Sequence, residues 1–279
     1  MGIDVSIFAS SVRPHLWDDA FKNLSTNKCS YEVVFSGDLE EDIVKPYLDK
    51  YSFLKYIHTA RIKPAQNYYV AWKNCSGVYC LWTADDAEYS DGLLDKCIEY
   101  HSSLKNFRAI LSLKTNEDGK NNDLDDHRFF GNNKNTPLMA PIAFLNTKLV
   151  EVLGGFDRRI VAGQWENDFC MRNYSSGGIT VKFEDVCVFI EHIKKHGKST
   201  KFWTAYDHDR MILENTWCIG GYAPAEKIMT VFDQSRKPPF WNYIPVINRE
   251  VSKKPLLPFE PYEDKDLLTK SQSHKGQWE

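Results

Sequence analysis

The stretch GVYCLWTADDA, residues 77–87, runs from an apolar segment directly into two adjacent acids, Asp85 and Asp86. The apolar segment predicts a buried strand. Ligands of parallel α/β sheets bind at the carboxyl ends of the strands, and two neighbouring carboxylates there repel each other unless a cation neutralises them. A divalent metal is therefore one interpretation of the pair. The other is that one of the two acids caps the helix that follows.

Similar apolar runs alternate with helical patterns through the first half of the chain. The predicted strands lie at residues 5–9, 31–36, 54–58 and 78–83. The predicted helices lie at 16–24 and 43–48, at a third position beginning with Pro64, and at a fourth following Ser90 as N-cap. This alternation is typical of a largely parallel sheet flanked by helices.

The second half contains a long polar insertion and a proline-rich end. Residues 114–136 are rich in Asn and Asp and too long for an ordinary connector, which leaves a lid, an acceptor loop or a disordered insertion as interpretations. Residues 234–279 contain six of the twelve prolines, which excludes a regular helix or a central strand. The other predicted elements are strands at 107–113, 139–146 and 186–191 and a short helix at 148–153. We expect a domain over 1–233, with halves 1–105 and 106–233, followed by a Pro-rich extension at 234–279.

The composition excludes several classes of protein. A chain of 279 residues that is 42% hydrophobic can bury a sizeable core. The formal net charge is −3 and basic residues occur at most in pairs, so no nucleic-acid partner is expected. No segment approaches the roughly 20 apolar residues of a membrane span and no signal peptide is recognisable, which predicts a cytoplasmic protein. The seven cysteines form no C-x-x-C pair, which favours reduced core residues over a zinc site or disulfides.

Four further motifs place polar or charged residues after predicted strands or at a helix start. They are FASSVR at 8–13, YEVVFSGD at 31–38, LGGFD at 153–157 followed by ENDFCMR at 166–172, and FIEH at 189–192. Alone, each motif is weak. An aspartate after a strand is more often a turn residue, and acids are common in the first turn of any helix.

In this order, and together with the acids at 85–86, the motifs resemble the inverting nucleotide-sugar glycosyltransferases of family 2 over about residues 3–220. The resemblance implies a single α/β domain of the GT-A fold, with a mixed, mainly parallel central sheet flanked by helices. It implies transfer of a sugar from a nucleotide-diphosphate donor to a hydroxyl of a glycan or glycolipid acceptor. Many members act in polysaccharide synthesis at the inner membrane face, so a peripheral membrane association is compatible with the resemblance.

The resemblance implies that the first half binds the nucleotide. Asp38 would hydrogen-bond the uracil ring, which favours a UDP-sugar, and Asp85 would contact the ribose. The other implied nucleotide-binding residues are Ala9, Ser10 and Arg13 in the loop that cradles the base, and Asn67 early on the third helix. The chain departs from the family pattern at two positions. Ala84 replaces the first acid of the usual signature, and Gln66 replaces the more usual arginine.

The resemblance also implies a metal cofactor, Mn²⁺ or Mg²⁺, bound by Asp86 and His192. This ion would stabilise the charge that develops on the leaving diphosphate. A core histidine is the other interpretation of His192. The basic segment at 194–199 would close over the diphosphate, or simply carry solvated surface charge.

The resemblance also implies the catalytic residues, because in the family an arginine follows the catalytic carboxylate by six residues. Counting back from Arg172, Glu166 takes the position of the catalytic base, and Asp168 is the second acid and the alternative base. A carboxylate is needed because a protonated hydroxyl is a poor nucleophile, and a single in-line displacement would invert the anomeric configuration. The implied acceptor-binding residues are Gly154, Gly155 and Trp165, and Trp165 either stacks on the acceptor sugar or belongs to the core.

Two other functions compete with this interpretation. A sugar-phosphate nucleotidyltransferase would also bind a nucleotide and magnesium, but residues 10–14 contain no glycine where that class has a glycine-rich segment. A glycan-binding module that has kept the fold and lost catalysis is favoured by Ala84 in place of the first acid.

Overall fold

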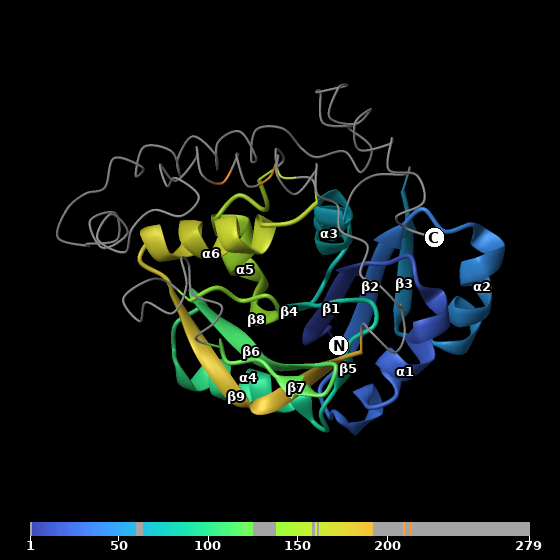
Figure 1. The fold of residues 1–279 in the computed structure, drawn as a ribbon, viewed down its shortest axis with the longest axis horizontal. Helices are drawn as coiled ribbons and strands as arrows, with labels where there is room; N and C mark the ends of the chain where they lie inside the picture. Colours follow the sequence, from blue (N-terminus) through green and yellow to red (C-terminus); the bar gives the residue numbers. More distant parts are fainter. Residues whose placement is uncertain are drawn as a thin grey trace.

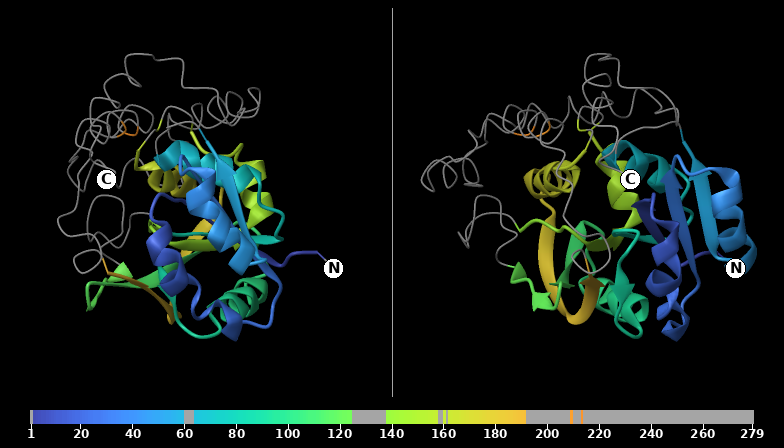
Figure 2. Two further views of the ribbon diagram at one scale, coloured as in Figure 1. Left: turned by 90° about the vertical axis from the view of Figure 1, so that its right-hand side faces the viewer. Right: turned by 45° about the vertical axis from the view of Figure 1, so that its right-hand side comes forward.

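The computed structural model describes residues 2–59, 64–124, 138–157, 160, 162–191, 209 and 213. In this part of the chain, one nine-stranded sheet lies between two layers of helices (Figures 1 and 2). Both predicted halves of the domain contribute strands to this sheet. The fold is therefore the predicted α/β architecture.

The sheet is mixed and mainly parallel, as predicted. Its strands are β1 (Val5–Ser10), β2 (Tyr31–Gly37), β3 (Leu54–His58), β4 (Tyr79–Trp82), β5 (Glu88–Tyr89), β6 (Ala109–Glu117), β7 (Lys120–Asn121), β8 (Ala143–Asn146) and β9 (Ile179–Ile190). They follow the order β3-β2-β1-β4-β8-β6-β9-β5, and β7 pairs with β6. β1, β2, β3, β4, β6 and β9 run in one direction, whereas β5, β7 and β8 run in the other.

The helices divide between the two faces of the sheet (Figure 1). α3 (Pro64–Lys73), α5 (Thr147–Val152) and α6 (Trp165–Ser175) cover one face, and α1 (Trp17–Phe21), α2 (Glu41–Lys50) and α4 (Leu93–Ser103) cover the other. Two short 3-10 helices, η1 (Pro14–Leu16) and η2 (Leu24–Thr26), flank α1. Among the described residues, none of the helices has the length and apolar character that a bilayer crossing requires.

Each central strand supplies side chains to two separate cores. Phe8 and Trp82 belong to the core beneath α3, α5 and α6, whereas Ile7 and Leu81 belong to the core beneath α1, α2 and α4. Successive side chains of a strand point to opposite faces, so a continuous apolar run fills both cores. This explains why β4 ends in three buried apolar residues, Cys80, Leu81 and Trp82.

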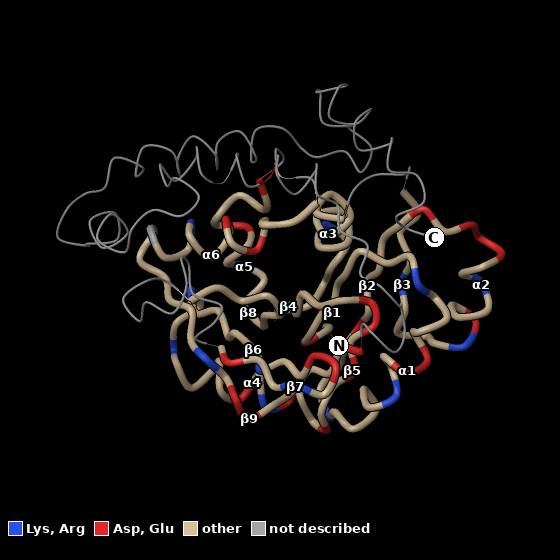
Figure 3. Tube along the Cα trace, viewed as in Figure 1, with Lys and Arg blue, Asp and Glu red and all other residues tan. Residues whose placement is uncertain are grey.

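The helix ends follow local sequence signals, with one correction. α2 begins with Glu41 and Asp42 and ends with Lys50, charges that complement the helix dipole (Figure 3). The predicted N-cap at Ser90 is wrong, because α4 begins after Gly92, whose φ of 65° lies in the left-handed region. Ser90 Oγ instead accepts a hydrogen bond from the Cys187 backbone at 3.0 Å, which ties the end of β5 to β9.

The second half differs more from the sequence prediction. β6 continues to Glu117 and turns back into β7, so the predicted polar insertion begins as a hairpin. β9 begins at Ile179 rather than at 186, and residues 184–186 fall between its two registers with β6. This irregularity and the charged residues Lys182, Glu184 and Asp185 interrupt the pattern of a buried strand, so the sequence did not predict the first half of β9. Residues 125–137 and the Pro-rich extension at 234–279 lie outside the described residues.

Candidate active site

The carboxyl ends of β1, β2 and β4 meet at one edge of the sheet. β1 pairs in parallel with both neighbours, placing Ser10 opposite Ser36 and Phe8 opposite Trp82. The loops that leave these strands therefore begin side by side. They carry the predicted nucleotide-binding residues Ser10, Arg13, Asp38 and Asp85, together with the predicted metal ligand Asp86. Of these, Ser10, Arg13 and Asp38 are partly exposed, whereas Asp85 and Asp86 are buried.

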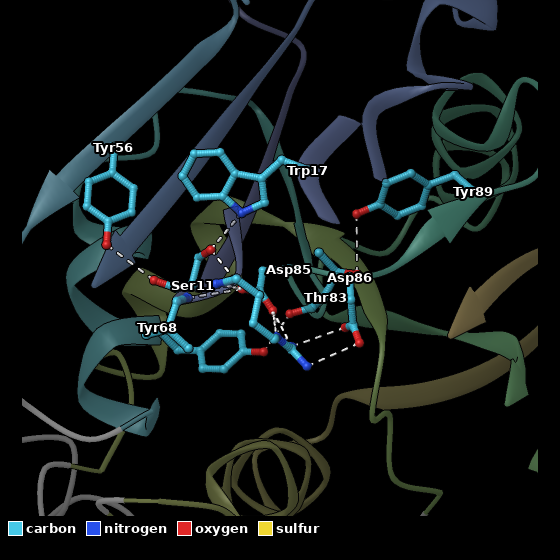
Figure 4. A network of polar contacts seen from close by, with 10 residues as sticks. Ser11, Trp17, Tyr56, Tyr68, Thr83, Asp85, Asp86 and Tyr89 are labelled. Carbon is cyan, nitrogen blue, oxygen red and sulfur yellow. Dashed lines mark hydrogen bonds and ion pairs between the residues drawn. The ribbon is translucent and has the colours of Figure 1, made fainter. Parts of the chain in front are cut away.

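Asp85 holds the loop that follows β1. Its Oδ2 accepts hydrogen bonds from Ser11 Oγ at 2.8 Å and from the backbone nitrogens of Val12 and Arg13, each at 3.1 Å. Its Oδ1 accepts from Arg13 Nε at 2.8 Å. Trp17 Nε1 donates to Ser11 Oγ at 2.9 Å, which links the loop to the core (Figure 4). Asp85 thus positions the loop, while the ribose contact inferred from the sequence stays a prediction.

Arg13 joins the two acids. Its Nη2 is ion-paired with Asp85, and its two terminal nitrogens each lie 3.2 Å from an oxygen of Asp86. The side chains of Asp85 and Asp86 are 1% and 0% exposed, whereas that of Arg13 is 29% exposed. Burial alone would lower the pKa of Arg13, but the two carboxylates outweigh it and raise that pKa. The repulsion expected between adjacent acids is thus balanced by a protein cation.

This arrangement bears on the predicted metal site. Asp86, the expected ligand, already accepts hydrogen bonds from Arg13 at both oxygens. His192, the other expected ligand, lies outside the described residues. No group of three or more His, Cys, Asp and Glu side chains that could hold a metal occurs within the described ranges. The described residues of this site do not fit a divalent cation.

Tyr68 of α3 connects the acidic pair to α6. Its hydroxyl donates to the Thr83 carbonyl oxygen at 2.5 Å (Figure 4). Its ring centroid lies 4.8 Å from that of Trp165. Burial raises the pKa of Tyr68, and the negative charges of Asp85 and Glu166 raise it further. Carboxylates from the end of β4 and from the start of α6 therefore act on the same phenol. The sequence gives no signal for this role, because Tyr68 lies among apolar residues that predict core.

Arg172, a member of a buried ion pair on α6, connects this helix to the Gly154-Gly155 turn. Gly154 and Gly155 adopt φ values of 79° and 81°, and their nitrogens donate to the carbonyls of Glu151 and Val150, a glycine-ended helix cap for α5. Arg172 Nη1 donates to the Leu153 carbonyl at 2.7 Å. The partner of Arg172 is Asp168, whose Oδ2 lies 2.8 Å from Arg172 Nε. Asp168 is 1% exposed, which favours a structural role over that of the alternative base.

Glu166 differs from Asp168 in its environment. It is partly exposed in the first turn of α6. Burial raises the pKa of Glu166 to about 7, and the negative charge of Asp209 contributes to the increase. Asp209, which no sequence motif singles out, accepts hydrogen bonds from the backbone nitrogens of Ala162 and Gly163 at 2.6 and 2.8 Å. Asp209 thereby holds the segment before α6 in place, and its negative charge contributes to the electrostatic potential at Glu166.

Three other residues predicted to bind ligands are buried. Ala9 is 0% exposed and packs in the core beneath α1, α2 and α4. Asn67 is 4% exposed, and its Oδ1 accepts from Thr59 Oγ1 at 2.9 Å. Trp165 is 5% exposed and packs with ring centroids 4.6 Å from Phe156, which agrees with its interpretation as core.

Comparisons with known proteins establish the fold. No family model matches the sequence, and no curated protein does. The 1–349 fragment of S. aureus TarS, whose structure has also been solved with UDP-GlcNAc, superposes with a TM-score of 0.60 at 14% identity, over 89% of this chain and 73% of that one. The mannosyltransferase PcManGT from Pyrobaculum calidifontis, solved with GDP-Man and Mn²⁺, gives 0.57 at 15% identity over 90% and 72%.

GalNAc-T7, solved with UDP, GalNAc and Mn²⁺, gives a TM-score of 0.59 at 12% identity over 90% of this chain and 58% of that one. The chain has the GT-A fold. Of these neighbours, PcManGT is a mannosyltransferase, and TarS and GalNAc-T7 have been solved with UDP-GlcNAc and with UDP, respectively. At identities of 12–15% the likeness concerns the fold, and the reaction must be argued from the site.

Proposed function

We propose that this protein is a glycosyltransferase that moves a sugar from a nucleotide-diphosphate donor, a UDP-sugar by preference, to an acceptor hydroxyl. The observation that carries the proposal is that Tyr68 joins the two acidic regions. Its hydroxyl donates to the Thr83 carbonyl at 2.5 Å, two residues before Asp85, and its ring centroid lies 4.8 Å from that of Trp165, the residue before Glu166. A titratable carboxylate and a polar loop suited to a nucleotide thus adjoin one edge of a GT-A sheet. The neighbours solved with UDP, UDP-GlcNAc and GDP-Man support a donor of this class.

The donor would bind across the loops after β1, β2 and β4. Asp38, partly exposed after β2, would accept a hydrogen bond from the base. Ser10 ends β1, and Arg13 belongs to the loop after it, which Asp85 fixes through side-chain and backbone contacts. Ordering this loop before the donor arrives reduces the entropy lost on binding.

Glu166 would act as the general base. Its carboxylate takes the proton of the acceptor hydroxyl while the acceptor oxygen forms a bond to the anomeric carbon of the donor sugar. The bond from that carbon to the diphosphate oxygen breaks at the same time, and the nucleoside diphosphate leaves with the electron pair. A pKa of about 7 suits this task, since general bases work best when their pKa is near the operating pH.

Three acceptor-side and metal assignments complete the proposal. Gly154 and Gly155 end α5 in a turn, and Arg172 ties the residue before it, Leu153, to α6, the helix that carries the proposed base, so we assign this turn to the acceptor side. The acceptor itself would be a glycan or glycolipid.

The sequence-based prediction of Mn²⁺ or Mg²⁺ bound by Asp86 and His192 is supported by the Mn²⁺ present in PcManGT and GalNAc-T7. The pairing of Asp86 with Arg13 argues against a metal ion bound to Asp86.

The test is release of UDP from a panel of UDP-sugars, with and without simple saccharide acceptors. Glu166→Gln keeps the size of the side chain and removes the base, so turnover should fall by about a hundredfold or more. UDP affinity should stay within about twofold, because Glu166 is assigned to the acceptor. The matched control is Glu184→Gln on β9, an exposed glutamate that should leave turnover unchanged. Full activity of Glu166→Gln would show that the base is another residue.

A further inference from the structure

Of the three charged residues Arg13, Asp85 and Asp86, the arginine is the one that solvent reaches. Its side chain is 29% exposed, against 1% for Asp85 and 0% for Asp86. A ligand that approaches these residues therefore meets the guanidinium before either carboxylate. A positive group on the outside suits an anionic ligand such as a diphosphate, because guanidinium matches phosphate oxygens in charge and geometry.

The guanidinium also lies where a cation on Asp86 would have to bind. Its two terminal nitrogens each lie 3.2 Å from a different oxygen of Asp86, in the parallel two-bond arrangement of arginine and carboxylate. Mn²⁺ and Mg²⁺ need direct oxygen contacts and several ligands. Ala84 supplies no carboxylate where the usual acidic signature has its first acid.

Asp85 fixes Arg13 in this place. It accepts hydrogen bonds from the backbone nitrogen of Arg13 at 3.1 Å and from Nε at 2.8 Å, and it is ion-paired with Nη2. Moving the arginine aside for a metal would break these contacts and leave two buried carboxylates without this counter-charge. Leaving a buried charge uncompensated is strongly destabilising.

We propose that Arg13 supplies the positive charge that binds the donor diphosphate, with Asp85 and Asp86 as its positioning residues, and that donor binding does not require a divalent metal. This inference rests on the proposed function, since it concerns the same donor. The Arg13 side chain would then supply the positive charge that a bound metal ion would otherwise supply.

The experiment is calorimetric titration of the full chain with UDP, repeated with GDP, in EDTA and in Mn²⁺. The variants are Arg13→Ala, Arg13→Lys and the control Lys45→Ala, whose target is an exposed lysine paired with Asp49. Wild type should bind UDP with the same Kd, within about twofold, in both buffers. Arg13→Ala should weaken binding about tenfold or more in both, Arg13→Lys should weaken it less, and Lys45→Ala should not change it.

Each outcome decides a separate point. UDP binding that needs Mn²⁺ and disappears in EDTA would overturn the inference while leaving the proposed function intact. Metal-independent binding that Arg13→Ala does not weaken would overturn the assignment to Arg13. Absence of UDP and GDP binding in both buffers would contradict the proposed function itself. If Arg13→Ala does not fold, the wild-type comparison and Arg13→Lys still decide the question.

Discussion

Asp168 and Arg172 form an ion pair one helical turn apart on α6, with Arg172 Nε 2.8 Å from Asp168 Oδ2 and both side chains at most 1% exposed. Arg172 also donates to the Leu153 carbonyl, so the pair ties α6 to the end of α5. Glu166, two residues earlier on α6, is more exposed than Asp168. Two acids of one motif thus have separate functions, one in the fold and one in the proposed chemistry.

Asp168→Asn should destabilise the protein strongly. The substitution leaves Arg172 buried without its counter-charge, which typically costs about 3 to 5 kcal/mol of unfolding free energy. Urea denaturation followed by circular dichroism measures this loss. Lys45→Ala, which breaks an exposed pair, should cost less than about 1 kcal/mol. Equal effects of the two variants would refute the structural role of Asp168.

The rate of transfer should depend on the protonation of Glu166. With a pKa near 7, set by burial and by the charge of Asp209, the base is protonated at lower pH, so kcat/KM should fall about tenfold per pH unit below it. Asp209→Asn keeps the size of the side chain and its acceptor oxygen but removes the charge. The acid limb of the pH profile should therefore move to lower pH. A limb that stays in place would exclude Asp209 as a cause.

The same raised pKa predicts how stability depends on pH. A carboxyl whose folded pKa of about 7 exceeds its unfolded value of 4.5 keeps its proton more tightly in the folded state, so its ionisation lowers stability as pH rises from 4.5 to 7. Glu166→Gln cannot ionise. It should match wild type near pH 4 and be more stable above pH 7, by at most about 3 kcal/mol. Melting temperatures that differ equally at pH 4.5 and pH 8 would count against the shift.

Gly154→Ala should destabilise the end of α5. The φ of 79° at this position lies in the left-handed region, which costs a residue with a Cβ about 1 to 2 kcal/mol. Gly154→Asn should cost less, because asparagine tolerates this conformation. Chemical denaturation compares the two variants directly. An alanine variant as stable as wild type would mean that the turn does not need its glycine.

Local patterns predicted those parts of the fold that depend on short stretches of sequence. The apolar runs of β1, β2 and β4 and the acids after β4 could be placed because a parallel strand buried on both faces is mostly apolar. β5 and β7, two residues each, are too short to show a period, and the irregularity in β9 breaks its pattern. The start of α4 was misplaced because Ser90 is a good N-cap whose hydroxyl is used by a residue 97 positions away.

The site could be predicted only where a motif marked it. The motif predicted Arg13 as part of a loop, but its pairing with Asp86 depends on residues 73 positions apart. Tyr68 and Asp209 carried no signal, because an aromatic residue in a helix and a single acid in a polar segment are common in any protein. Ala9, Asn67 and Trp165 came from family positions, and the structure places their side chains in the interior.

The most direct test is a crystal structure of the chain soaked with UDP. The account predicts nucleotide at the carboxyl ends of β1, β2 and β4, with the uracil beside Asp38 and the diphosphate within hydrogen-bond distance of the Arg13 guanidinium. Nucleotide bound on another face of the molecule, with the Arg13 side chain away from any phosphate, would contradict it.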